Sequence, residues 1–152
     1  MKKKVYLAGA MACYGKDDTT AKDWRNQAKR WFKDHTDNFK VISPTDYYEY
    51  GETFHQTEKE VMRFDLRKVK EADVVLVNLN DLEKSLGTSD EILLAYLCGI
   101  PVIGFLKPKT NVYNSNEKIA QLHPWKREQL DRIECAHDGM VKAMQYIKDY
   151  YG

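Results

Sequence analysis

The chain has 152 residues, of which 43% are hydrophobic, and carries 24 Lys and Arg against 23 Asp and Glu. This length predicts a single domain over residues 1–152, large enough to bury about two thirds of its unfolded surface. A balanced charge with no basic stripe argues against a nucleic-acid polymer as partner. The apolar run after the basic MKKK start is too short for a signal peptide or membrane span, which predicts a cytoplasmic protein with no membrane partner.

Alternating apolar and charged residues predict the elements of the first half. In chain order they are a strand over 4–10, an amphipathic helix over 19–35, a strand over 39–43, a loop over 45–54, a helix over 57–71 and a strand over 73–79. The loop contains four aromatic residues and a glycine, so we expect it to close over a pocket.

The second half repeats the alternation. A small-residue turn leads into an apolar helix that ends near Gly99, followed by a strand over 101–106, an exposed loop over 107–118, a short strand over 131–135 and a helix over 137–151. Strands that alternate with helices predict an α/β fold, a three-layer α/β/α sandwich around a doubly wound, flavodoxin- or Rossmann-like sheet of about five parallel strands. Ligands of such sheets bind beyond the carboxyl ends of the strands, so we expect the site in the turns after the first and third strands.

Several familiar site motifs are missing from these turns and from the rest of the chain. The first turn, LAGAMACYG, has neither GxGxxG nor a P-loop. Cys13, Cys98 and Cys135 are widely spaced and lack CxxC, which argues against disulfides and zinc and predicts buried or incidental thiols. The four His residues form no metal-binding pattern. We therefore expect neither a cofactor nor a metal.

The second turn, SLGTSDE over 85–91, has two interpretations. Thr88 with Glu91 matches a capping box, in which Glu91 only stabilises the helix start. Alternatively, Gly87 lets the backbone approach a ligand, while the helix N-terminus holds Glu91 anionic and exposed as a nucleophile.

Asp65 and three neighbours of the first strand also have competing interpretations. By composition alone, Asp65 is a solvated acid beside Arg63 or Lys68. Tyr6 and Trp24 are expected in the core and Arg25 on the surface, with a ligand contact as the alternative for Arg25.

Four segments together resemble the nucleoside 2-deoxyribosyltransferase family over most of the first 106 residues. They are KVYLAGAM, VISP, FDLRKVKEADVVLVNL and SLGTSDEILLAYLCGIPVIGF. Within the last, GTSDEILLAYLCGIPV keeps the family's Gly, Thr, Glu, Ala, Gly and Pro in register.

The resemblance implies roles for specific residues. Glu91 is the implied nucleophile, which attacks the anomeric carbon of a 2-deoxyribosyl group and forms a covalent glycosyl-enzyme, and Asp65 helps to protonate the leaving base or orients Glu91 and the sugar. Tyr6 and Gly9 match the strand that lines the sugar pocket, and Gly87 and Thr88 match the substrate-binding turn. The implied partners are a 2'-deoxynucleoside or deoxynucleotide, a free nucleobase and further copies of the chain, whose DYYG tail is a candidate contribution to a neighbouring site.

Two departures from the family pattern leave alternatives open. Many transferases have Asp where this chain has Ser85, and Ser-Leu-Gly there is similar to the 2'-deoxynucleoside 5'-monophosphate N-glycosidases, in which the Ser helps to bind the 5'-phosphate. ILLAY replaces the common IGYA. Asp81 is either a substitute for the missing acid or a turn residue. The leading interpretation is a transferase; the alternatives are a monophosphate hydrolase and a non-catalytic nucleotide sensor.

Overall fold

The computed structural model describes residues 1–48, 55–108 and 122–152. The elements run in the order β1 (Lys3–Gly9), α1 (Thr20–His35), β2 (Phe39–Ile42), η1 (Pro44–Asp46), α2 (Glu58–Lys70), β3 (Val74–Asn78), η2 (Leu82–Lys84), α3 (Leu86–Leu97), β4 (Val102–Leu106), α5 (Pro124–Gln129), β5 (Arg132–Cys135) and α6 (Gly139–Tyr151).

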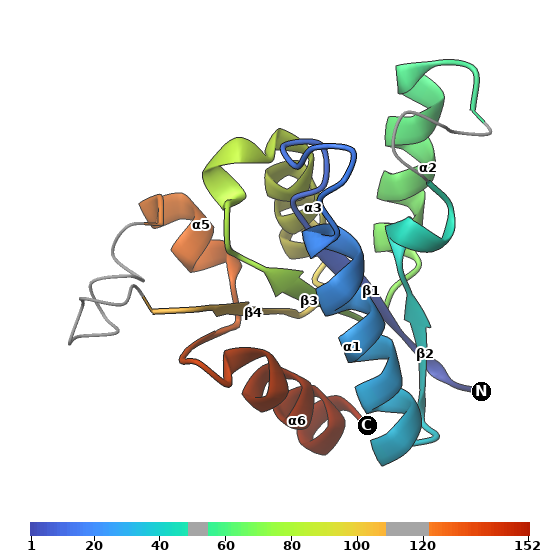
Figure 1. Ribbon diagram of the computed structural model, residues 1–152. Coiled ribbons are helices and arrows are strands. Elements are labelled where there is room, and N and C mark those ends of the chain that lie inside the picture. Colours follow the sequence, from blue (N-terminus) through green and yellow to red (C-terminus); the bar gives the residue numbers. More distant parts are fainter. Residues whose placement is uncertain (49–54, 109–121) are drawn as a thin grey trace.

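All five strands form one parallel sheet in the order β2-β1-β3-β4-β5 (Figure 1). Strand order reverses direction at β1, where β2 lies on one side and β3 on the other. Such a reversal opens a crevice beyond the carboxyl ends of the two strands on either side of it, here β1 and β3. The predicted doubly wound sheet is confirmed.

Helices cover both faces of the sheet and complete the three predicted layers. One buried cluster combines Val5 and Leu7 of β1 with residues of α1 and α6, and the other combines Tyr6 and Ala8 of the same strand with residues of α2 and α3. Successive residues of a strand point to opposite faces, so β1 supplies both clusters. Tyr6 therefore points toward the face of the sheet that α2 and α3 cover.

Two local expectations differ from the structure. The segment after Pro44 begins as the short helix η1 rather than as a loop, while residues 49–54 of the predicted loop and most of the predicted loop over 107–118 lie outside the described residues. Helix α5 was not predicted, because six residues are too few to show helical periodicity. A signal existed nonetheless: Pro124 stands at its first position, behind a His123 ring nitrogen that accepts from the Trp125 amide.

The remaining sequence expectations concern the membrane and the cysteines. Among the described residues, no helix is both long and apolar enough to cross a bilayer. All three cysteines are free; Cys13 and Cys98 are exposed, so of the two expected alternatives, buried or incidental thiols, only the second fits them.

Candidate active site

The start of α3 differs from the predicted capping box. Ser85, not Thr88, is the N-cap: its Oγ accepts from the Thr88 amide at 3.4 Å and lies 2.6 Å from the Thr88 hydroxyl. Gly87 and Thr88 therefore belong to the first turn of the helix. The predicted capping box does not form, because the helix begins three residues earlier, with Ser85 accepting from the Thr88 amide. Glu91 then lies in the second turn, and its side chain is free for another contact.

Glu91 faces the sheet rather than the solvent. Its Oε2 is buried, and neither this atom nor Tyr6 Oη has a hydrogen-bond partner of ordinary geometry within the described residues. Burial raises the pKa of Glu91 to about 7, and the nearby Asp65 adds to this, while the Tyr6 hydroxyl and Arg25 act in the opposite direction. The prediction of an exposed Glu91 that the helix N-terminus holds anionic is therefore wrong, because burial outweighs a helix dipole that fades beyond the first turn.

Asp65 lies on α2 in a half-buried position toward Glu91. Burial raises its pKa, against the hydrogen-bonding Tyr48 hydroxyl and the charge of Arg25. Neither Arg63 nor Lys68 forms an ion pair with it in the described parts of the chain, and Lys68 instead approaches Glu71 at 3.6 Å. Asp65 is thus no solvated surface acid, and two carboxyl groups with raised pKa values share one site.

Arg25 also lies elsewhere than the sequence analysis predicts. Its side chain is fully buried rather than on the surface. Nη2 donates to the Gly9 carbonyl at 2.9 Å and Nη1 to the Ala21 carbonyl at 3.0 Å, and the guanidinium lies 4.6 Å from the centroid of the Trp24 ring. Its charge lowers the pKa of both Glu91 and Asp65. The buried Arg25 therefore binds the end of β1, and its positive charge favours the ionised forms of Glu91 and Asp65.

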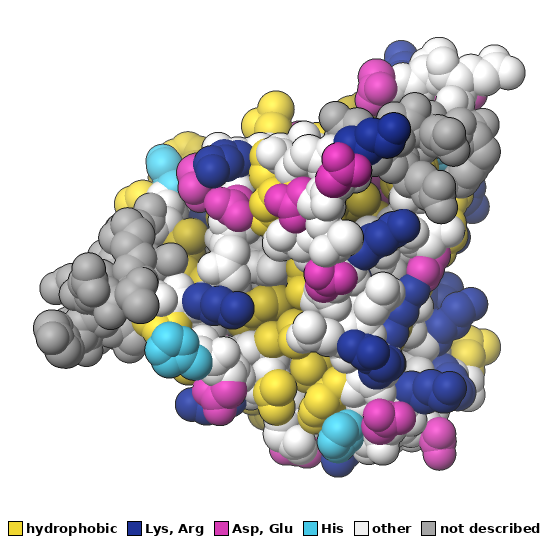
Figure 2. Space-filling model, viewed as in Figure 1, with side chains coloured by type: hydrophobic (Ala, Val, Ile, Leu, Met, Phe, Trp, Pro, Cys, Tyr) yellow, Lys and Arg dark blue, Asp and Glu magenta, His cyan; other side chains and the backbone are white. Residues whose placement is uncertain are grey.

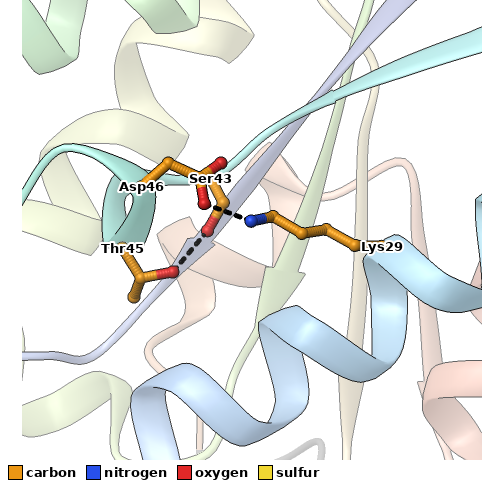
Figure 3. A network of polar contacts seen from close by, with 4 residues as sticks. All are labelled: Lys29, Ser43, Thr45 and Asp46. Carbon is orange, nitrogen blue, oxygen red and sulfur yellow. Dashed lines mark hydrogen bonds and ion pairs between the residues drawn. The ribbon is translucent and has the colours of Figure 1, made fainter.

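Helix η1, which precedes Tyr48, is held against α1. Lys29 of α1 forms an ion pair with Asp46, and the Ser43 hydroxyl lies 2.8 Å from that of Thr45 (Figure 3). Tyr48 follows two residues later and contacts Asp65. The end of β2 thus holds a tyrosine over the acid of the neighbouring helix.

The other predicted site residues divide into two groups. Thr88 lies one turn before Glu91 on α3, and Gly87 is exposed beside it with open space where a Cβ would stand. Gly9 belongs to the other face of the sheet from Glu91 and Asp65. A Cβ at this position would lie 2.9 Å from the Trp24 ring, on the face that α1 covers. Asp81 is a turn residue with φ of 60° that accepts from Tyr14.

A sequence model of the family described as nucleoside 2-deoxyribosyltransferase matches residues 5–141. The chain belongs to this family. No curated protein matched its sequence. The family supports deoxyribosyltransferase or related N-glycosidase activity for this chain.

Solved structures resemble this deoxyribosyltransferase-family chain at low identity. A conserved protein from Enterococcus faecalis V583 has a TM-score of 0.72 at 14% identity, over 98% of this chain and 99% of that one. A 2-desoxiribosyltransferase from Leishmania mexicana has 0.64 at 15%, over 99% of both chains. A 2-deoxyribosyltransferase from Bacillus psychrosaccharolyticus has 0.50 at 21%, over 83% of this chain and 90% of that one. At these identities the likeness shows the fold alone.

Proposed function

We propose that this family member is a nucleoside 2-deoxyribosyltransferase that cleaves the N-glycosidic bond of 2'-deoxyribonucleosides. Glu91 is the nucleophile and Asp65 the proton donor. The observation that carries the proposal is that Glu91 and Asp65 lie at one site, where burial raises both pKa values, that of Glu91 to about 7. A carboxyl group that titrates near neutrality, beside a second acid whose pKa is raised, suits nucleophilic and acid–base catalysis of glycosidic cleavage.

The two acids would act in sequence. The Glu91 carboxylate bonds to the anomeric carbon as the bond from that carbon to the base breaks, and protonated Asp65 gives its proton to the departing base. An incoming base then attacks the same carbon, the ester to Glu91 breaks, and Asp65 takes up the proton that the new base loses. Configuration is retained, as expected for two displacements. The neutral Tyr6 hydroxyl, whose pKa burial raises further, stabilises the ionised Glu91 before the first step and after the second.

A second candidate is hydrolysis of 2'-deoxynucleoside 5'-monophosphates. Ser85 favours it, because its hydroxyl lies at the N-terminus of a helix of 12 residues, beside the exposed backbone of Gly87. Helix N-termini attract phosphate. If no base is released from either substrate, the remaining alternative is a nucleotide sensor without turnover. Three further expectations remain predictions: the binding roles of Gly9, Gly87 and Thr88, the single domain and the cytoplasmic location.

The deciding experiment is chromatographic. The protein is incubated with a 2'-deoxynucleoside plus a different free base, and separately with the matching 5'-monophosphate. A swapped nucleoside supports the transferase, whereas base released only from the monophosphate supports the hydrolase and makes Ser85→Ala the next variant. Glu91→Ala should abolish either reaction, while Glu128→Ala, at an exposed position of α5, should not. Full activity of Glu91→Ala would end the proposed mechanism.

We also propose that the enzyme is a homo-oligomer that associates through α3. Leu86, Leu93 and Leu97 recur on one side of this helix and are 80%, 38% and 70% exposed. An exposed apolar stripe of this kind indicates a protein interface. The tail does not reach its own Glu91, because the Tyr151 carbonyl is bound by Lys3 at the amino end of β1. A fully active monomer in analytical sedimentation would refute this assembly.

A further inference from the structure

Each acid of the candidate site is paired with one tyrosine. The Tyr6 hydroxyl faces Glu91, and the Tyr48 hydroxyl donates a hydrogen bond to the Asp65 carboxyl group. At Asp65 this bond opposes the effect of burial more than any nearby charge does. Tyr48 is therefore the direct partner of the proposed proton donor.

The surroundings of Tyr48 and Asp65 differ from the face of the sheet that α1 and α6 cover. On that face, side chains of both charge signs lie at the surface around exposed hydrophobic side chains (Figure 2). Solvent weakens interactions between charges in such positions. Asp65 is half-buried instead, and the hydroxyl oxygen of Tyr48 is buried. A hydrogen bond is electrostatically stronger in such surroundings, so the loss of one donor has a larger effect at Asp65.

Both the ring and the backbone of Tyr48 are held in place. The Tyr48 ring lies beside the His55 ring, with centroids 6.0 Å apart, and the His55 ring packs on Phe64 with centroids 5.0 Å apart. Phe64 immediately precedes Asp65 on α2. The Tyr48 amide donates to the Pro44 carbonyl of η1 at 3.1 Å. The hydroxyl is thus positioned at Asp65 before the reaction begins, as an effective catalytic donor must be.

The Tyr48 hydroxyl remains protonated and therefore remains a donor. Burial raises the pKa of Tyr48, and the charge of Asp65 raises it further. In a protonated carboxyl group, one oxygen carries the proton and the other only accepts. A tyrosine that donates to one oxygen of Asp65 therefore leaves the acidic proton on the other.

The same bond gains strength during the reaction. When the acidic proton leaves, Asp65 becomes a carboxylate, and a hydrogen bond to an ionised group is about twice as strong as one between neutral groups. Tyr48 thus stabilises the state that forms as the base departs more than it stabilises the bound substrate, and such a difference raises kcat.

We propose that Tyr48 is a positioning residue of the proton donor, which occupies one oxygen of Asp65 so that the other oxygen carries the proton to the departing base. The inference rests on the proposed function. In this step the O–H bond of Asp65 breaks, the proton forms a new bond to the base, and the resulting carboxylate keeps the hydrogen bond from Tyr48.

Steady-state kinetics of Tyr48→Phe test this role, because the substitution removes the hydroxyl and keeps the ring. With the 2'-deoxynucleoside that the wild type cleaves, kcat should fall about tenfold to a hundredfold, the effect of losing one hydrogen bond to a charged group, while KM changes less than about twofold. Tyr47→Phe is the matched control. The Tyr47 ring also packs on Phe64, with centroids 5.4 Å apart, but its hydroxyl makes no bond to Asp65 within the described residues, so kcat should stay within about twofold of the wild type.

A second substrate separates an effect on the proton from an effect on packing. The N7-methylated form of a purine 2'-deoxynucleoside, or the 5-fluoro form of a pyrimidine one, releases a base that depends less on protonation. The loss caused by Tyr48→Phe should therefore be several-fold smaller with this analogue than with the parent nucleoside.

The outcomes distinguish this inference from the proposed function. An active wild type with an unchanged kcat in Tyr48→Phe refutes the role of Tyr48 alone, as does an equal loss with both substrates or an equal loss in Tyr47→Phe. A wild type that releases no base overturns the proposed function, and this inference with it. A loss confined to Tyr48→Phe that shrinks with the analogue supports it.

Discussion

Replacing Glu91 with glutamine should stabilise the protein relative to the wild type, and the difference in the free energy of unfolding should grow as the pH rises. Burial raises the pKa of Glu91 from 4.5 to about 7, so the folded state binds this proton more tightly than the unfolded state does. The free energy of unfolding of the wild type should therefore fall as the pH rises from the unfolded to the folded pKa. The full loss is about 3 kcal/mol at 1.36 kcal/mol per unit, and about 2.5 kcal/mol of it falls between about pH 5 and about pH 8.

Glu91→Gln removes the titration and preserves the volume, so its stability should not show this loss. Urea unfolding of both proteins across this pH range measures the difference, in which the other titrating groups cancel. By melting temperature, the variant should gain roughly 5 to 10 °C over the wild type between the two pH values. Glu128→Gln, at an exposed position of α5, is the control and should follow the wild type. Parallel wild-type and Glu91→Gln curves would show that Glu91 is not held in a desolvated position.

Three further substitutions test the surroundings of Glu91. Arg25→Gln removes the charge that lowers the pKa of Glu91, so the acid limb of kcat/KM should move to higher pH, while Arg30→Gln on the exposed side of α1 should leave it in place. Gly9→Ala would place a Cβ 2.9 Å from the Trp24 ring, and chemical unfolding should show a loss of about 1 to 3 kcal/mol. Gly87→Ala meets open space and should stabilise α3 by up to about 1 kcal/mol, yet raise KM if substrate approaches the backbone there.

The sheet could be predicted because its strands are buried on both faces. β3 and β4 are buried at every position, and such strands appear in the sequence as continuous apolar runs. Alternation with amphipathic helices then leaves few topologies. Helix α5 lacks both signals, since it is short and most of its residues are charged or polar.

The sequence indicates the two acids of the candidate site, but not their burial or the buried arginine beside them. The resemblance picks out Glu91 and Asp65, and the structure brings them together. Arg25 was assigned to the surface because a lone arginine on an amphipathic helix is usually solvated. Only the tertiary structure shows that the carbonyl of Gly9 and the ring of Trp24 accept it in the interior. Ser85 was overlooked as a cap because Thr88 offered a better match to the capping-box pattern.

The cost of burying Glu91 is consistent with its proposed role in catalysis. In the free protein a desolvated carboxylate is disfavoured, which is what its raised pKa expresses. During cleavage of the glycosidic bond the sugar acquires positive charge beside that carboxylate, and in a site that excludes water this attraction is stronger than in solution. A neutral bound substrate offers no such charge. The unfavourable burial is therefore relieved mainly at the transition state, and it is this difference between transition state and bound substrate that accelerates a reaction.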